Sequence, residues 1–393
     1  MNRRTLLRSA VAWPLARAAS AVLPLGAAQV AVAAAPAEAA YRRPLVLVEL
    51  KGGNDGLNTL VPFADPTYYA LRPRIAIPRD QVLQLSDRAG LHPALAPLLP
   101  AWRDGTLAVL QGVGYPQPNL SHFRSIEIWD TASSSADYLQ EGWLTRAFAT
   151  RPVPGTFAAD GVIIGSQDLG PLAGGGTRAI ALADTDQFLR RARLAQPGLA
   201  GGNKALAHVL KVEGDIVQAA SHLSGRAAFA TTFPPGGFGN AVRTACQILA
   251  NPAGVAVVRI SLSGFDTHTG QPATQARLLG EVAAGLVALR DALTETGQWQ
   301  DTLVLTYAEF GRRPKENQNA GTDHGTASVH FAFGGRVKGG LYGAQPDLAK
   351  LSGDGNVQHA LDFREVYATV LDRWWGADAR ATLGGTFRPV AFV

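Results

Sequence analysis

Seven runs of mostly apolar residues follow one another along the chain, and each has the length of a single strand. The runs are residues 44–50, 105–114, 161–165, 179–183, 254–264, 301–311 and 328–335. Apolar runs without alternation are typical of strands that are buried on both faces of a parallel sheet. The stretches between them carry apolar residues at spacings of three and four, most clearly in QARLLGEVAAGLVALRDALTETG. The pattern predicts an α/β fold, with a mainly parallel sheet flanked by helices on both faces.

No repeat or linker interrupts this pattern, so one α/β domain over residues 40–393 is the favoured organisation. A mostly helical stretch at about 185–245 has the pattern of an insertion or a cap.

The first 39 residues are expected to be a leader rather than part of the fold. Arg3 and Arg4 form a pair, and a weakly apolar stretch follows that ends in small residues, with Ala35 and Ala39 as equally suitable cleavage positions. This order is typical of a twin-arginine export signal, whose arginine pair a receptor reads. The alternative is a basic, disordered amino terminus. Export would make the twin-arginine translocase a partner and the periplasm or the medium the destination.

Composition excludes several classes of protein. The chain has 393 residues, of which 47% are hydrophobic and 17% charged, and its formal net charge is +5. Four arginines of the leader account for most of that excess, so no basic patch indicates a nucleic acid partner. No apolar run after the leader reaches the length of a membrane span. The single cysteine, Cys246, excludes an intrachain disulfide and a cysteine-rich metal site.

Polar residues of the kind that bind metals follow four of the predicted strands. In an open parallel sheet, ligands bind at the carboxyl ends of the strands. The residues found there are Asp55, then Ser121 and His122, then Asp266 and His268, then Glu309, Arg312, Asp323 and His324. Each group also has a simpler explanation: Asp55 suits a tight turn, Ser121 suits a helix cap, and Asp266 with His268 suits a hydrogen-bonded loop. The Asp-His-Gly sequence at 323–325 is the hardest to explain by packing, and the combination favours a site.

Carboxylates and imidazoles without thiolates suit Zn²⁺, Mn²⁺ or similar divalent ions, and separate strand ends can hold one or two of them. Two ions about 4 Å apart stabilise the attacking and leaving oxygens of a displacement at phosphorus. A serine near them, here Ser121, would be the nucleophile. Arg124, Arg146 and Arg312 are candidates to bind an anionic group.

The motifs LVELKGGNDGLNTLVP, NLSHFRS, GFDTHTGQ, AEFGRRPKENQNAGTDHG and GGRVKGG together resemble the alkaline-phosphatase-like superfamily. The resemblance is closest to an uncharacterised bacterial branch that carries twin-arginine leaders and a domain of unknown function, and it covers roughly residues 44–376. It implies that Asp55 binds metal and that Ser121 is the nucleophile. It further implies that Asp266 and His268 bind one ion, and that Asp323 and His324 bind the other.

The resemblance also implies a further histidine ligand, for which His330 and His359 are the candidates, and Glu309 is a possible replacement for a missing ligand. A serine-type sulfatase would need proline at the third position of its motif, and SHFRS has none. The expected function is therefore that of an exported, metal-dependent hydrolase of phosphate esters, acting on a small-molecule or glycan-linked ester. The alternative is a catalytically degenerate scaffold that binds an envelope glycan or a protein partner.

Overall fold

The computed structural model describes residues 37–182 and 227–393 of the chain. Almost all of the expected leader lies outside the described residues, as does most of the stretch at about 185–245. None of the described helices is long and apolar enough to cross a membrane.

The described part of the chain contains a central sheet of nine strands, in the order β11-β5-β10-β9-β1-β8-β6-β7 with β12 beside β5. Its strands are β1 (Leu45–Lys51), β5 (Leu107–Gly114), β6 (Ala159–Ile164), β7 (Ala179–Leu182), β8 (Val255–Ser263), β9 (Leu303–Tyr307), β10 (Ser328–Phe333), β11 (Gly340–Tyr342) and β12 (Leu361–Asp362). Only β10 runs against its neighbours, β5 and β9. All seven apolar runs form strands of this sheet, so the predicted mainly parallel α/β fold is confirmed.

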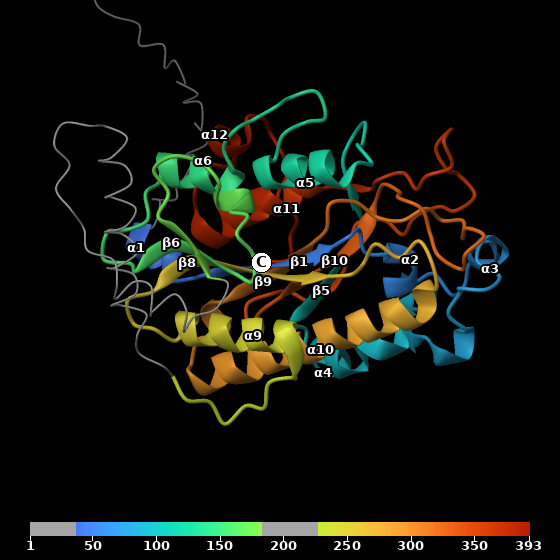
Figure 1. The fold of residues 1–393 in the computed structure, drawn as a ribbon, viewed down its shortest axis with the longest axis horizontal. Coiled ribbons are helices and arrows are strands. Elements are labelled where there is room, and N and C mark those ends of the chain that lie inside the picture. The colour runs from blue at the N-terminus through green and yellow to red at the C-terminus, as the bar shows by residue number, and fades with distance from the viewer. Residues whose placement is uncertain (1–36, 183–226) are drawn as a thin grey trace, which may run out of the picture. The chain divides into compact units, whose positions relative to one another are not determined.

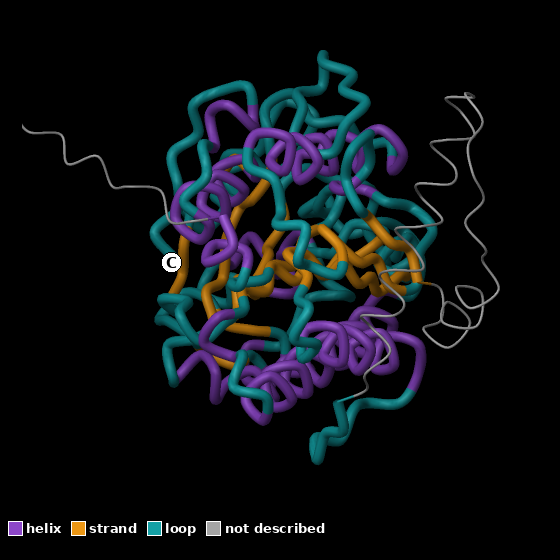
Figure 2. Tube along the Cα trace, turned by 90° about the vertical axis from the view of Figure 1, so that its left-hand side faces the viewer, coloured by secondary structure: helices purple, strands orange, loops and turns teal. Residues whose placement is uncertain are grey.

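Helices cover both faces of the sheet, which lies between them in Figures 1 and 2. On one face lie α4 (Leu99–Arg103), α9 (Gly236–Leu249) and α10 (Gln271–Glu295). On the other lie α5 (His122–Thr131), α6 (Trp143–Thr150), α11 (Phe363–Ala368) and α12 (Ala379–Leu383). The other described α-helices are α1 (Ala37–Tyr41), α2 (Gly56–Thr59) and α3 (Pro66–Leu71). A small second sheet joins β2 (Leu60–Val61), β4 (Gly90–Leu91) and β3 (Leu83–Gln84).

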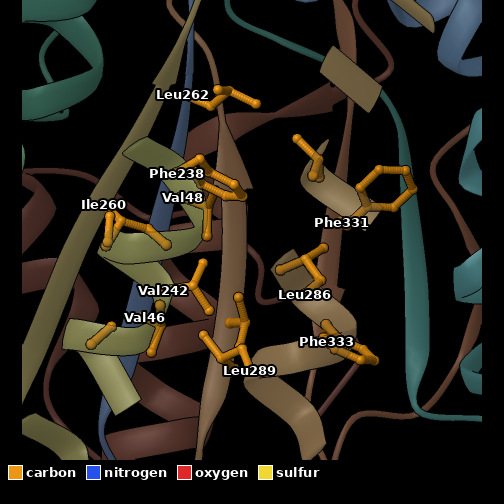
Figure 3. Close-up of a cluster of buried hydrophobic side chains, with 14 of the residues drawn as sticks. Val46, Val48, Phe238, Val242, Ile260, Leu262, Leu286, Leu289, Phe331 and Phe333 are labelled. Carbon is orange, nitrogen blue, oxygen red and sulfur yellow. The ribbon is translucent and has the colours of Figure 1, made fainter. Parts of the chain in front are cut away.

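Strand β1 shows why its apolar run is continuous. Val46 and Val48 pack in the cluster beneath α9 and α10, where Figure 3 shows them beside Phe238 and Leu289. Leu47 faces the opposite way and packs in the cluster beneath α5 and α6. Because side chains alternate along a strand, both faces need apolar residues when helices cover both.

His330 lies inside the fold rather than at a strand end. It belongs to β10, its side chain is buried, and its ring packs edge-on against Trp129 at a centroid separation of 5.3 Å. Neither ring nitrogen has a hydrogen-bond partner among the described residues. His330, which the sequence analysis predicts as a metal ligand, therefore lies in the apolar interior between the sheet and α5. Burial lowers the pKa of His330 to about 3.

His330 should make the protein sensitive to acid. In the unfolded chain its pKa is near 6.5, so between pH 6.5 and about 3 the unfolded state binds a proton that the folded state does not. The free energy of unfolding should therefore fall as the pH falls through this range. Denaturant titrations at pH 7 and pH 5 measure this effect. Between these two pH values, the free energy of unfolding of His330→Leu should fall by about 2 kcal/mol less than that of the wild type. Equal losses in both proteins would contradict this assignment.

Candidate metal centre

The candidate site lies at one edge of the sheet, where strands β9, β1 and β8 are neighbours and end together. Asp266 and His268 follow β8, and the segment with His324 follows β9. The fourth residue of the site is His122, the first residue of α5. It follows β5, which ends at the same edge of the sheet. The position agrees with the rule that ligands bind at the carboxyl ends of parallel strands.

Three side chains converge there closely enough to share one ion. One potential ligand atom from each of His122, Asp266 and His324 lies within 4.8 Å of the other two. His268 adds a fourth donor, because its Nε2 lies 3.0 Å from Oδ1 of Asp266 and 3.0 Å from Nε2 of His324. Among the described residues, the first three form the one group of this kind.

Two of the three histidines have a hydrogen-bond acceptor at Nδ1, and the Nε2 atoms of all three are directed at Asp266. His122 Nδ1 lies 2.8 Å from Glu309, and His324 Nδ1 lies 2.8 Å from the backbone oxygen of Leu120. His268 Nδ1 faces Asp323 at 3.5 Å. A ring that donates from Nδ1 carries its lone pair on Nε2, and this arrangement is how proteins orient histidines toward metals.

The separations between these atoms match the coordination shell of a small divalent ion. The two oxygens of Asp266 lie 3.2 Å from His324 Nε2 and 3.5 Å from His122 Nε2. A tetrahedral zinc ion with bonds of about 2.0–2.1 Å holds its ligand atoms about 3.3 Å apart. His268 Nε2 and His324 Nε2 lie 3.0 Å apart, a separation at which one ring can donate to the other or both can bind a common ion. The residues therefore fit a divalent ion bound by nitrogen and oxygen.

Arg312 fixes Asp266 and is not free to bind a substrate. Its guanidinium is buried, and it donates to Oδ1 of Asp266 at 2.6 Å. Its other hydrogen bonds go to backbone oxygens of Gly52, Gly53, Phe265 and Thr322. Partial burial acts to raise the pKa of Asp266, but Arg312 and then the neighbouring histidines lower it to about 2. Asp266 is thus a carboxylate, as metal binding requires.

Glu309 is buried and lies behind the site rather than in it. Its carboxylate accepts hydrogen bonds from the backbone N–H groups of Gly52 and Gly53 and contacts His122. The structure therefore places the predicted ligand Glu309 where it orients His122 and joins the loop after β1 to the segment after β9. Phe310 supports the same arrangement, since its ring packs against His122 and His324.

Asp55 is separated from this cluster by its own partners. It is buried, forms an ion pair with Arg72 and accepts a hydrogen bond from Gln271. It also accepts from the backbone N–H of Leu57 as the cap of α2. With both oxygens engaged, Asp55 has the structural role that its turn sequence also suggested, and the structure does not bring it to the site as the sequence predicts.

Three further predicted residues take other positions. Asp323 faces His268 and the amide of Asn317, so it orients a ligand from the outer side. Arg124 is held by the backbone oxygens of residues 134, 135 and 137 and by Glu127, and does not face the site. Ser121 is exposed and makes no capping hydrogen bond to α5. It stands between Leu120 and His122, both of which touch the centre.

The sequence analysis places His122 at a strand end but does not assign it as a metal ligand. It follows the same strand as Ser121 and lies next to it, but an alkaline-phosphatase-like pattern draws attention to the serine. The usable signal was the pairing of a histidine after one strand with an Asp-x-His after another, at ends that a parallel sheet brings together.

A cavity of about 520 Å³ opens beside the centre. His122 and Asp266 line it together with Lys51, Phe123 and Ser263. Phe123 is 89% exposed, and Lys51 is the one cationic residue among the described lining residues. The candidate centre therefore has direct access to a space that can hold a small substrate.

The fold and the site define an α/β protein with a candidate His/Asp metal centre at the carboxyl edge of its sheet. The chain belongs to the family described as "Protein of unknown function (DUF1501)", whose profile matches residues 107–384. That segment includes His122, Asp266, His268 and His324. No curated protein matches the chain.

Several solved structures are similar to the chain at low sequence identity. The crystal structure of Ps i-CgsB in complex with k-i-k-neocarrahexaose is 11% identical, with a TM-score of 0.41 over 88% of this chain and 74% of that one. The lipoteichoic acid synthase LtaP from Listeria monocytogenes is 11% identical, with a TM-score of 0.35 over 89% and 76%. The alkaline phosphatase from the Antarctic bacterium TAB5 is 10% identical, with a TM-score of 0.32 over 76% and 94%.

The metal content of single-residue variants should distinguish the metal ligands from the residues that only orient those ligands. The wild type should retain about one equivalent of zinc or manganese after dialysis, and His122→Ala or Asp266→Ala should retain almost none. Asp323→Asn, the matched control, should still bind the ion, with an affinity lower by about tenfold to a hundredfold. Elemental mass spectrometry measures the content. Metal retained by His122→Ala and lost from Asp323→Asn would reverse the assignment.

Gly52 should be essential to the geometry of the centre. Its φ is +116°, and a Cβ there would lie 2.4 Å from the backbone nitrogen of Asp266. Gly52→Ala should therefore force the loops after β1 and β8 apart, lower the free energy of unfolding by about 1–3 kcal/mol and weaken metal binding. Gly280→Ala is the control, since that position in α10 is open and helical. A Gly52→Ala protein with unchanged stability and metal affinity would rule out this close approach as a constraint.

Proposed function

We propose that this protein is an exported, metal-dependent hydrolase of phosphate esters, with sulfate esters the less favoured substrates, and that Ser121 is its nucleophile. The observation that carries the proposal is the convergence of three histidine Nε2 atoms on Asp266 beside an open cavity. The resemblance of the strand-end motifs to the alkaline-phosphatase-like superfamily supports the same reaction class. The expected export signal supports a site of action outside the cytoplasm.

Different residues of the chain would have different roles in such a reaction. His122, Asp266, His268 and His324 would hold the ion, which when bound polarises the phosphoryl group and stabilises developing negative charge. Lys51, at the cavity wall, is placed to attract the anionic ester, the role that Arg312 cannot take because its donors are engaged. Phe123 offers an apolar surface to the alcohol part of the substrate.

Ser121 would attack phosphorus from the edge of the centre. A bond forms between its Oγ and phosphorus, the ester P–O bond breaks, and the alcohol leaves with a proton. Water then hydrolyses the phosphoserine, which releases phosphate and restores the hydroxyl group. The free hydroxyl supports this role over that of a helix cap, and so favours a hydrolase over a scaffold that only binds.

Replacing the nucleophile should abolish turnover without removing the ion. Ser121→Ala should lower kcat for p-nitrophenyl phosphate or bis-p-nitrophenyl phosphate by at least about a thousandfold, while its metal content stays at the wild-type level. Ser263→Ala is the matched control, because Ser263 also lines the cavity and should leave kcat within about threefold. Full activity in Ser121→Ala would refute the serine mechanism, and an inactive metal-loaded wild type on all phosphate esters would refute the proposed function.

A further inference from the structure

A second cavity, of about 330 Å³, lies next to the first and has an acidic lining. Glu127 and Asp130 reach it from α5, and Asp168 reaches it from the segment after β6. Ile126 and Asp168 line both cavities, so the two spaces are neighbours. No lysine or arginine is among the described residues that line the second cavity.

Asp130 is the unusual member of this lining. It is only 7% exposed, and its Oδ1 has no hydrogen-bond partner among the described residues. Gly170 lies beside it, where a Cβ would come within 2.8 Å of the Arg259 guanidinium and within 3.1 Å of that oxygen, so a side chain there would clash with both groups. Burial raises the pKa of Asp130 well above its usual range, against the opposing effect of Arg259. Buried carboxyl groups are normally hydrogen-bonded, so a partner from a ligand would account for this one.

The neighbouring charges are already paired with other groups. The guanidinium of Arg259 donates to Tyr307, to the backbone oxygen of Asp168 and to Glu49. Glu127 is paired with Arg124 at 2.9 Å, and Asp168 accepts from the backbone N–H of Gly170. Among the three acids of the lining, Asp130 is therefore the one whose carboxyl group is left for a ligand.

The geometry points to a subsite for a positively charged amine. This inference rests on the proposed function: the substrate would be a phosphate ester whose alcohol carries an ammonium group, with the phosphoryl group at the metal centre and the ammonium group against Asp130. An ammonium group supplies several donors and a positive charge, which a buried carboxylate binds by short, charge-assisted hydrogen bonds. The lining residues Thr131 and Gln140 carry no charge, and the charge of the neighbouring Arg259 is paired with Glu49 at 2.8 Å.

His122 and Asp130 lie eight residues apart on α5, about 12 Å along the helix axis, so the probe needs a long alcohol chain. The test therefore compares 6-aminohexyl phosphate with hexyl phosphate, which differ only by the amine. Dissociation constants are measured by calorimetry and kcat/KM by phosphate release, on the zinc- or manganese-loaded wild type and on Asp130→Asn. The wild type should prefer the amine by at least about tenfold in both quantities, and Asp130→Asn should lose that preference. Asp137→Asn, which removes an exposed acid near α5 outside the lining, should keep it.

The outcomes separate this inference from the function on which it rests. Turnover of both esters with equal dissociation constants would overturn the amine subsite and leave the hydrolase standing. A binding preference that Asp130→Asn removes, without turnover of either ester, would uphold the subsite and overturn the hydrolase. If Asp130→Asn does not fold, Gln140→Lys at the exposed edge of the cavity should remove the preference by repulsion, and an unchanged preference there would count against the subsite.

Discussion

The guanidinium of Arg312 holds the site together. It is buried at the edge of the sheet and binds backbone oxygens from the segments that follow β1, β8 and β9, as well as the carboxylate of Asp266. A buried charge of this kind costs desolvation energy, which its hydrogen bonds offset without large net stabilisation. Its contribution is geometric, because three separate segments must take one relative position to satisfy it. The direction of Asp266, and with it the convergence of the histidines, depends on that constraint.

The fold could be predicted from the sequence because it depends on local pattern. Continuous apolar runs identify strands with two covered faces, and amphipathic stretches identify the helices between them. The reversed direction of β10 could not be predicted, since an apolar run has no direction. The prediction of His330 in β10 as a metal ligand failed to anticipate its environment for a related reason. The sequence does not reveal whether an imidazole faces an ion or an aromatic ring, here that of Trp129.

The sequence predicts where the candidate site lies, but not the role of each of its residues. The strand-end rule identified the correct edge and supplied Asp266, His268 and His324, but the role of each acid depended on partners far away in the sequence. Asp55 is bound by Arg72, and Glu309 is bound by the loop of Gly52 and Gly53. Asp323 touches the ring of His268 from outside. Three carboxylates of one chemical type thus cap a helix, support a ligand and orient a ligand, and only three-dimensional packing separates these roles.

The donors of the centre are spread between residues 122 and 324, on segments that meet only when β5, β9, β1 and β8 lie in register. Short pieces of the chain cannot form the centre, so an ion cannot serve as an early nucleus in the way that zinc organises small fingers. The sheet has to assemble first, on hydrophobic burial alone, and an ion then adds stability by mass action. Under the proposed export, the compartment in which the chain folds would therefore decide which metal it first meets.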